Sequence, residues 1–210
     1  MNLLAFDTST DVLSIAAART VDGAVQVWAH TGAGGAQAST GLIAGVLGVL
    51  QQAGLTLAEL DAICFGSGPG SFTGLRIATG VAQGLAFGAN VPVIPIPTLL
   101  ALAEATRQER VLAVLDARMG EVYAAAYERV GVEWDTIFAP CLCKPDALPL
   151  LPDGLWNGVG SGFAAYGDVL QKRFATQLSA IGAARYPHAR EIAQLALDRI
   201  YEACPAEQAL

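Results

Sequence analysis

Charged residues are scarce in this 210-residue chain, and the scarcity is confined to one segment. Asp, Glu, Lys and Arg make up 15% of the residues, against about 25% in an average soluble domain. Between residues 23 and 103 the only charged side chains are Glu59, Asp61 and Arg76. A solvated surface normally carries charges, so this segment is expected to be covered on more than one side.

Other absences exclude several classes of function. The net charge is −7 and the pI is near 4.7, which leaves no basic surface to hold nucleic acid phosphates unaided. His30 and His188 are the only histidines, so the sequence contains no HxxxH or HExxH metal motif. A GxSxG nucleophile elbow is also absent. We therefore expect no metal site and no catalytic residues.

Targeting signals are absent as well. The four cysteines show no CxxC spacing, which favours reduced thiols. The first residues lack the basic start of a secretory signal. Residues 77–103 are uncharged, but Pro92, Pro95 and Pro97 interrupt them well short of the roughly 20 apolar residues that span a bilayer. The sequence predicts a cytoplasmic protein without a membrane span.

Strand and helix patterns alternate along the chain, which favours an α/β fold. A glycine-rich loop is expected at 31–35 and a proline-rich connection at 140–152. Ser39 or Thr40 is the expected cap of one helix and Ser71 that of the next, which Gly88 should close. The expected strands are 2–6, 12–18, 24–29, 62–66, 91–96, 110–115, 121–127, 134–139 and the start of 156–162, and the expected helices are 39–53, 71–87, 99–106, 163–174 and 188–204.

The pattern of strand, Asp, turn and strand occurs twice. Asp7 ends the first strand and Asp116 ends the strand at 110–115, and each Asp is followed by a short turn and an Ala-rich strand. The repeat favours two related subdomains, 1–106 and a smaller 107–210, although hairpins are common enough for coincidence to stay an alternative.

Two loops have features of anion sites. Asp7 to Thr10 combines a carboxylate with hydroxyls, as in the phosphate loops of duplicated ATPase folds, but the local sequence favours an ordinary Asx turn. Residues 66–76 join a strand to a helix N-terminus, where free N–H groups favour anions. That segment lacks the ending of a P-loop, and a turn packed tightly against another backbone is the alternative.

Glycines recur every four residues on the two uncharged helices. They are Gly41 and Gly45 on the first helix, and Gly80, Gly84 and Gly88 on the second. A glycine inside a helix costs about 1 kcal/mol relative to alanine. Spacing of four aligns the glycines in a groove that a second helix can approach closely. We interpret the two helices as covered by their own sheet on one side and by a partner on the other.

Three ordered motifs resemble the bacterial TsaB family, also called YeaZ. They are Leu4 to Thr10, Phe65 to Ile77 with the following Gly80 to Ala86, and Leu115 to Tyr123. The resemblance implies a duplicated actin-like ATPase fold (acetate kinase, sugar kinase, Hsp70 and actin) with two ribonuclease H-like subdomains, the second reduced. It further implies a non-catalytic subunit in the synthesis of N6-threonylcarbamoyladenosine at position 37 of tRNA.

In that family the catalytic partner is TsaD, and the small ATPase TsaE completes the complex. The resemblance thus implies a scaffold that binds and activates TsaD and docks TsaE, reaches tRNA only through the complex, and can form a homodimer in isolation. It implies no cofactor, with ATP or ADP bound weakly at most or at the complex interface.

Two sets of site residues follow from the resemblance. The partner interface maps to the two uncharged helices, with Thr40, Ile43, Leu47, Ser71, Phe72, Thr73, Gly74, Arg76, Gly80, Gln83, Gly84 and Phe87. A relic nucleotide site maps to Asp7, Thr8, Ser9, Thr10 and Asp116.

This chain departs from the family pattern at two places. Residues 35–40 lack the charged and His residues that often begin the first interface helix, and the family's usual C-terminal tail has no counterpart. The alternative function is an ATP-dependent small-molecule kinase of the same fold, while a peptidase is disfavoured by the missing metal ligands.

Overall fold

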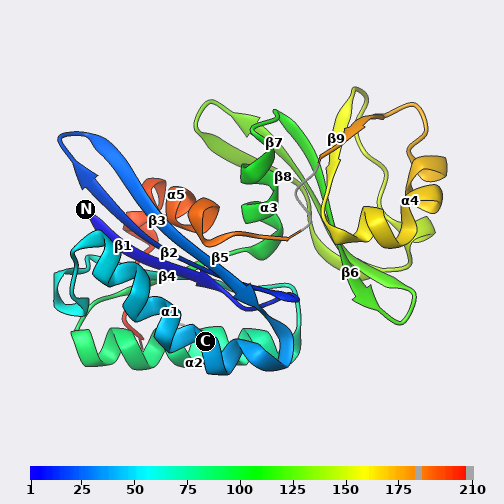
Figure 1. Cartoon of the computed structure of the whole chain (residues 1–210). Helices are drawn as coiled ribbons and strands as arrows, with labels where there is room; N and C mark the ends of the chain where they lie inside the picture. The colour runs from blue at the N-terminus through cyan, green and yellow to red at the C-terminus, as the bar shows by residue number, and fades with distance from the viewer. Residues whose placement is uncertain (183–185, 207–210) are drawn as a thin grey trace. The chain divides into compact units, whose positions relative to one another are not determined.

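Two five-stranded mixed sheets carry the fold in the computed structural model, which describes residues 1–182 and 186–206 (Figure 1). One unit comprises Met1–Ala101 and the C-terminal stretch from Pro187, and the other comprises Leu102–Tyr186. Each unit contains one of the sheets.

The first sheet has the order β3-β2-β1-β4-β5. Strands β1 (Asn2–Asp7), β2 (Val12–Val21) and β3 (Ala24–Ala33) form an antiparallel meander. Strands β4 (Ala62–Gly66) and β5 (Val93–Ile96) continue the sheet in parallel with β1. The central strands are continuous apolar runs and are buried on both faces, as parallel strands between helices require.

The second sheet repeats this order as β8-β7-β6-β9-β10. Strands β6 (Arg110–Arg118), β7 (Glu121–Val130) and β8 (Glu133–Cys143) are antiparallel, and β9 (Trp156–Val159) and β10 (Leu178–Ile181) are parallel additions. The equal strand order confirms the duplicated α/β architecture that the repeat of Asp7 and Asp116 predicted.

Helices cover both faces of the first sheet. Helices α1 (Ala38–Ala53) and α2 (Phe72–Ala89) lie on one face and α5 (Ala189–Asp198) on the other (Figure 1). Alternate residues of the strands point to each face, so β1, β2 and β4 send one set of side chains into a core with α1 and α2. The remaining helical segments are α3 (Thr98–Thr106), α4 (Ser161–Arg173), η1 (Gly35–Gln37), η2 (Leu57–Glu59), η3 (Pro145–Ala147) and η4 (Ile200–Glu202).

The C-terminal stretch corrects the predicted domain boundary. The predicted second subdomain comprises all of 107–210, but the chain returns to the first unit at Pro187. The reason is the apolar face of α5, which packs against β1, β2 and β4. Ala189 N also donates a hydrogen bond to Ser14 Oγ at 2.9 Å. The last predicted helix, 188–204, is shorter than expected, since α5 ends at Asp198 and Cys204 forms an isolated bridge with Val93 of β5.

Several element boundaries also differ from the predictions. The loop expected at 31–35 is partly strand, because β3 continues to Ala33 opposite β2. The connection expected at 140–152 begins as strand, because Pro140 lies in β8 at the edge of its sheet, where a missing N–H is tolerated. Neither Ser39 nor Thr40 caps α1, whose N-cap is Gln37, and α2 ends at the left-handed Asn90 rather than at Gly88. Strand β10 was not predicted.

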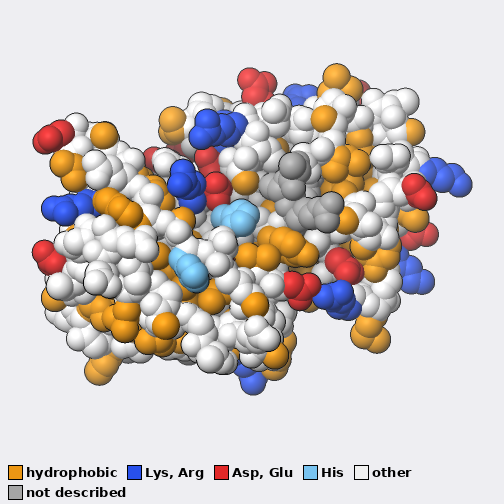
Figure 2. All heavy atoms as spheres, viewed as in Figure 1, with side chains coloured by type: hydrophobic (Ala, Val, Ile, Leu, Met, Phe, Trp, Pro, Cys, Tyr) orange, Lys and Arg blue, Asp and Glu red, His pale blue; other side chains and the backbone are white. Residues whose placement is uncertain are grey.

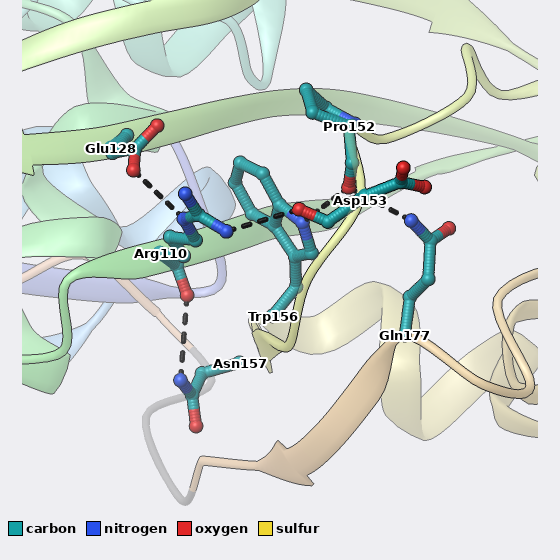
Figure 3. Close-up of polar contacts among 7 residues, drawn as sticks. All are labelled: Arg110, Glu128, Pro152, Asp153, Trp156, Asn157 and Gln177. Atoms are coloured by element: carbon teal, nitrogen blue, oxygen red, sulfur yellow. Dashed lines mark hydrogen bonds and ion pairs between the residues drawn. The ribbon is translucent and has the colours of Figure 1, made fainter.

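A polar network fixes the connection before β9 to the second sheet (Figure 3). Arg110 Nε donates to Glu128 Oε1 at 2.8 Å, and Arg110 Nη1 donates to the Asp153 carbonyl at 3.1 Å. Trp156 Nε1 donates to the Pro152 carbonyl at 3.1 Å, and Gln177 Nε2 reaches the same carbonyl at 2.9 Å. These contacts hold the connection with side chains that belong to the unit's own sheet and loops, so they have a structural role.

Candidate functional site

Helix α2 carries small residues on two opposite faces. Its buried face consists of Gly74, Ala78, Ala82 and Ala86, which let the helix lie close to the sheet. The opposite face carries Gly80, Gly84 and Gly88, and a Cβ placed on any of the three would meet no atom of residues 1–182 or 186–206 within 4 Å. The described part of the fold therefore gives no packing reason for these three glycines.

Gly41 and Gly45 of α1 have a different explanation. A Cβ on Gly45 would collide with Ile15 Cδ1, and one on Gly41 would lie 3.2 Å from Leu13 Cδ2. Both glycines thus allow α1 to pack on β2 of the chain's own sheet. The outward face of α1 instead presents Ile43 and Leu47, which are 44% and 57% exposed.

Two aromatic side chains stand at the ends of the outward face of α2. Phe72 is 68% exposed and Phe87 is 74% exposed. The Arg76 guanidinium stacks over the Phe72 ring at 4.0 Å from its centroid, and Arg76 is the only charged residue of α1 and α2. Figure 2 shows hydrophobic side chains gathered over these two helices. We call the outward residues the two-helix surface: Thr40, Ile43, Leu47, Ser71, Phe72, Thr73, Arg76, Gly80, Gly84, Phe87 and Gly88.

Two residues predicted for this surface have other contacts. Gly74, which was predicted for the interface, is buried, and a Cβ there would collide with the Thr8 carbonyl, so it faces the chain's own fold. Gln83 is half-buried, and its Nε2 donates to the Ala206 carbonyl at 3.1 Å. Ser71 is exposed, and its Oγ caps α2 by accepting from Gly74 N, as predicted. Gly88, which was predicted both as a helix terminator and as part of the glycine groove, lies on this surface.

The turn after β1 is filled by its neighbours. Asp7, Thr8 and Ser9 are at most 2% exposed. Asp7 Oδ1 accepts from Ser9 N at 2.9 Å and from Ser9 Oγ at 2.8 Å, which is an Asx turn. Thr8 Oγ1 donates to the Gly74 carbonyl at 2.7 Å. The Thr8 and Ser9 hydroxyls and the Ser9 amide are therefore bonded to the chain itself.

The loop at 66–74 packs directly on this turn. A Cβ on Gly66 would collide with Asp7 Oδ2, and a Cβ on Gly70 would lie 2.7 Å from the Ser9 carbonyl. Thr98, which the sequence analysis did not single out, joins the cluster by accepting from Gly68 N at 3.1 Å. The glycines thus serve close packing of one backbone on another, the alternative that the sequence analysis gave for this segment.

Burial raises the pKa of Asp7 to about 6, and the hydrogen bonds from Ser9 offset only part of that rise. Asp7 Oδ2 is buried and finds no hydrogen-bond partner among residues 1–182 and 186–206. A buried carboxylate oxygen without a partner is costly when ionised, so the protonated form is favoured well above the usual range.

The second Asp lies in the other unit and in a more open turn. Asp116 Oδ1 accepts from Arg118 N at 2.9 Å and from the Tyr166 hydroxyl at 3.2 Å. Asp116 N donates to Ser161 Oγ at 3.1 Å. Burial and the Asp116 carboxylate raise the pKa of Tyr166. The backbone contact matches that of Asp7, but the turn continues into the exposed Met119.

The described part of the chain contains neither a cluster of metal ligands nor a helix that could span a membrane. Residues 1–182 and 186–206 contain no group of three or more His, Cys, Asp or Glu side chains placed to hold a metal ion. Within the same ranges, no helix is both long enough and apolar enough to cross a bilayer.

Comparisons with known proteins agree with one another. A family model described as "TsaD: tRNA N6-adenosine threonylcarbamoyltransferase" matches residues 39–208. The tRNA threonylcarbamoyladenosine biosynthesis protein TsaB of Haemophilus influenzae is 38% identical, over 82% of this chain and 77% of the relative. TsaB of Escherichia coli is 37% identical, over 80% of this chain and 75% of the relative. The solved structure of YeaZ from Pseudomonas aeruginosa superposes with a TM-score of 0.86 at 35% identity, covering 100% of this chain and 97% of that one.

Proposed function

The chain belongs to the TsaB (YeaZ) family, whose members carry the actin-like ATPase fold, and we propose that it is the non-catalytic scaffold subunit of a tRNA threonylcarbamoyladenosine synthesis complex. In this proposal it binds and activates a TsaD protein through the two-helix surface. The small ATPase TsaE docks on the assembled pair. Family membership itself places the chain in the biosynthesis of threonylcarbamoyladenosine.

The observation that carries the proposal is the outward face of α2. Gly80, Gly84 and Gly88 line one stripe in open space, and each costs about 1 kcal/mol of helix stability relative to alanine. A partner helix that lies against the stripe recovers this cost through close backbone approach. The neighbouring Phe72 and Phe87 give the large apolar anchors that interfaces favour.

The charge pattern supports the same reading. The two-helix surface contains one charged residue, Arg76, whereas the whole chain carries a net charge of −7. The uncharged surface suits contact with another protein, and the acidic remainder disfavours direct contact with tRNA. We propose that tRNA is held by the partner, in the cytoplasm, with no cofactor bound by this subunit alone.

The filled turn at Asp7 disfavours the alternative, an ATP-dependent kinase. Thr8 and Ser9 direct their hydroxyls to Gly74 and Asp7 rather than into an open site. Calorimetry with MgATP on the isolated chain discriminates the two functions. Micromolar binding with phosphoryl transfer would favour the kinase.

The direct test is Gly84→Leu, which places a large side chain in the glycine stripe. The isolated chain should tolerate it, because a Cβ at Gly84 meets nothing within 4 Å. Association with the TsaD protein of the same organism, measured by calorimetry, should weaken by about a hundredfold or more, equivalent to about 3 kcal/mol. Modification of tRNA by the reconstituted complex should fall in parallel.

The matched control is Gly167→Leu on α4, where a Cβ also meets nothing within 4 Å. This variant should bind TsaD like the unmodified chain. Sedimentation of the isolated chain shows whether a homodimer uses the same surface, since Gly84→Leu would then disrupt it too. Normal association of Gly84→Leu with TsaD would refute the proposed interface.

A further inference from the structure

The turn between β1 and β2, residues 7–11, lies under the start of α2. We call it the β1–β2 turn. Thr8 Oγ1 donates to the Gly74 carbonyl at 2.7 Å, and Ser71 N donates to the Ser9 carbonyl at 2.7 Å. Ser71 is the N-cap of α2 and Gly74 is in its first turn. Two hydrogen bonds thus tie the β1–β2 turn to the N-terminus of α2.

The same turn also holds the chain that leads into α1. Gly34 N donates to the Asp11 carbonyl at 2.9 Å, and Gly35 N donates to the Thr10 carbonyl at 3.1 Å. A Cβ on Gly34 would lie 2.5 Å from the Thr10 carbonyl oxygen, so the two backbones are in direct contact. The short helix η1 follows and continues into α1.

These contacts leave little freedom to either helix start. The first turn of α2 cannot move toward the β1–β2 turn, because the Thr8 carbonyl already occupies the space of a Cβ on Gly74. It cannot move away without losing the bond from the buried Thr8 hydroxyl. Phe72 and Arg76, both exposed on the two-helix surface, are two residues from Gly74 on either side.

We infer that the β1–β2 turn is a positioning element for the two-helix surface. Thr8 and Ser9 set the first turn of α2, while Thr10 and Asp11 set the approach to α1. Thr8 and Ser9 are buried, so they act on the partner only through the helices that they hold. The inference rests on the proposed function for the identity of the partner, but the positioning itself is a property of this chain.

The experiment compares Thr8→Val, which removes the hydroxyl at nearly constant volume, with Thr8→Ser, which keeps it. Gly74→Ala is a second and stronger perturbation of the same contact. Ile192→Ala is the control for general loss of stability, since Ile192 is fully buried on α5, across the sheet from the two-helix surface. Two quantities are measured: the dissociation constant for TsaD, and hydrogen exchange of the amides of residues 72–78 in the isolated chain.

We expect Thr8→Val to weaken TsaD binding by about threefold or more, from the loss of one buried hydrogen bond. Gly74→Ala should weaken it further, and both variants should exchange faster at 72–78. Thr8→Ser should restore both values, and Ile192→Ala should lower global stability while leaving binding of the folded protein unchanged.

Three outcomes would overturn the inference. One is unchanged binding and exchange in both Thr8→Val and Gly74→Ala. Another is failure of Thr8→Ser to rescue, and the third is an equal loss of binding in Ile192→Ala. If the unmodified chain does not bind TsaD, the proposed function fails by itself, and the exchange rates at 72–78 still decide whether the turn positions α2.

Discussion

The two halves of the molecule carry the same Asx contact near the end of their first strand, at the last residue of β1 and two residues before the end of β6, yet only the first is fully buried. Ser9 N reaches Asp7 Oδ1 at 2.9 Å, and Arg118 N reaches Asp116 Oδ1 at 2.9 Å. Asp7 is fully buried, whereas the side chain of Asp116 is 20% exposed. Equal local sequence patterns therefore give equal backbone contacts but different environments.

The difference comes from the glycines that follow the parallel strand of each half. In the first half, Gly66, Gly70 and Gly74 let the start of α2 lie on the Asp turn itself. In the second half, Gly160 and Gly162 let the start of α4 lie on Val114, before the turn. The position of the helix N-terminus, rather than the Asp itself, therefore decides whether the turn at the Asp is open or sealed.

The largest effect is expected from Gly66→Ala, which tests the sealed turn directly. The added methyl group would collide with the buried Asp7 carboxylate, so the free energy of unfolding should fall by about 3 kcal/mol. Urea unfolding measures the change. Gly167→Ala is the control from the second half, because its surroundings are open and no loss is expected. Equal stability of the two variants would show that the first turn is not packed as described.

The second prediction concerns pH and uses Asp7→Asn beside Asp116→Asn. The folded pKa of Asp7 is raised from 3.8 to about 6. Its stabilising contribution is therefore full below about pH 4 and is lost as the pH rises through about 6, with a total loss of roughly 3 kcal/mol.

Urea unfolding between pH 4 and pH 7 separates the two variants. Asp7→Asn should remove this decline in stability with rising pH, because the amide does not titrate. Asp116→Asn should keep it. If the unfolding free energy of Asp7→Asn and of the unmodified chain depended on pH in the same way, the raised pKa of the buried Asp7 carboxyl would be contradicted.

The sequence predicted the first half well for physical reasons that are local. Ser71 as a cap, strand 62–66 and the uncharged helices follow from capping chemistry and from composition. The scarcity of charge between residues 23 and 103 also predicts which two helices carry the two-helix surface. The repeated Asp predicted the duplication, since an Asx turn needs only residues two apart.

The remainder depended on contacts that are distant in sequence. Gly45 of α1 and Gly84 of α2 look alike in the sequence, because each lies in a helix with few polar residues, and only the phase of each helix on the sheet separates them. Gly74 has the same difficulty, because its neighbour Thr8 lies 66 residues away. The return of residues from Pro187 to the first unit likewise depends on which sheet face α5 meets.

The third prediction compares the hydroxyl that each Asp accepts from. Ser9 Oγ donates to Asp7 Oδ1 at 2.8 Å in a buried site, and the Tyr166 hydroxyl donates to Asp116 Oδ1 at 3.2 Å in a part-exposed one. Ser9→Ala should cost about 1.5 kcal/mol and Tyr166→Phe clearly less, because water replaces the lost partner only in the second case. Thermal unfolding at one pH ranks the two, and the reverse order would count against the contrast between sealed and open turns.

The smallest effect is expected from alanine at exposed glycines of α2 and α4, where the changes in stability and in TsaD binding should differ. Gly80 on α2 and Gly167 on α4 both face open space, so alanine at either position should stabilise the isolated chain by about 0.5 to 1 kcal/mol through helix propensity. Their effects on TsaD association should differ, because only Gly80 belongs to the two-helix surface. Gly80→Ala should weaken association while it raises the unfolding midpoint, and Gly167→Ala should raise the midpoint alone. If replacing Gly80 stabilises the fold but weakens TsaD association, the glycine serves the partner contact rather than the fold. A Gly80→Ala variant with both a higher unfolding midpoint and tighter TsaD association would contradict a role of the glycine stripe in that contact.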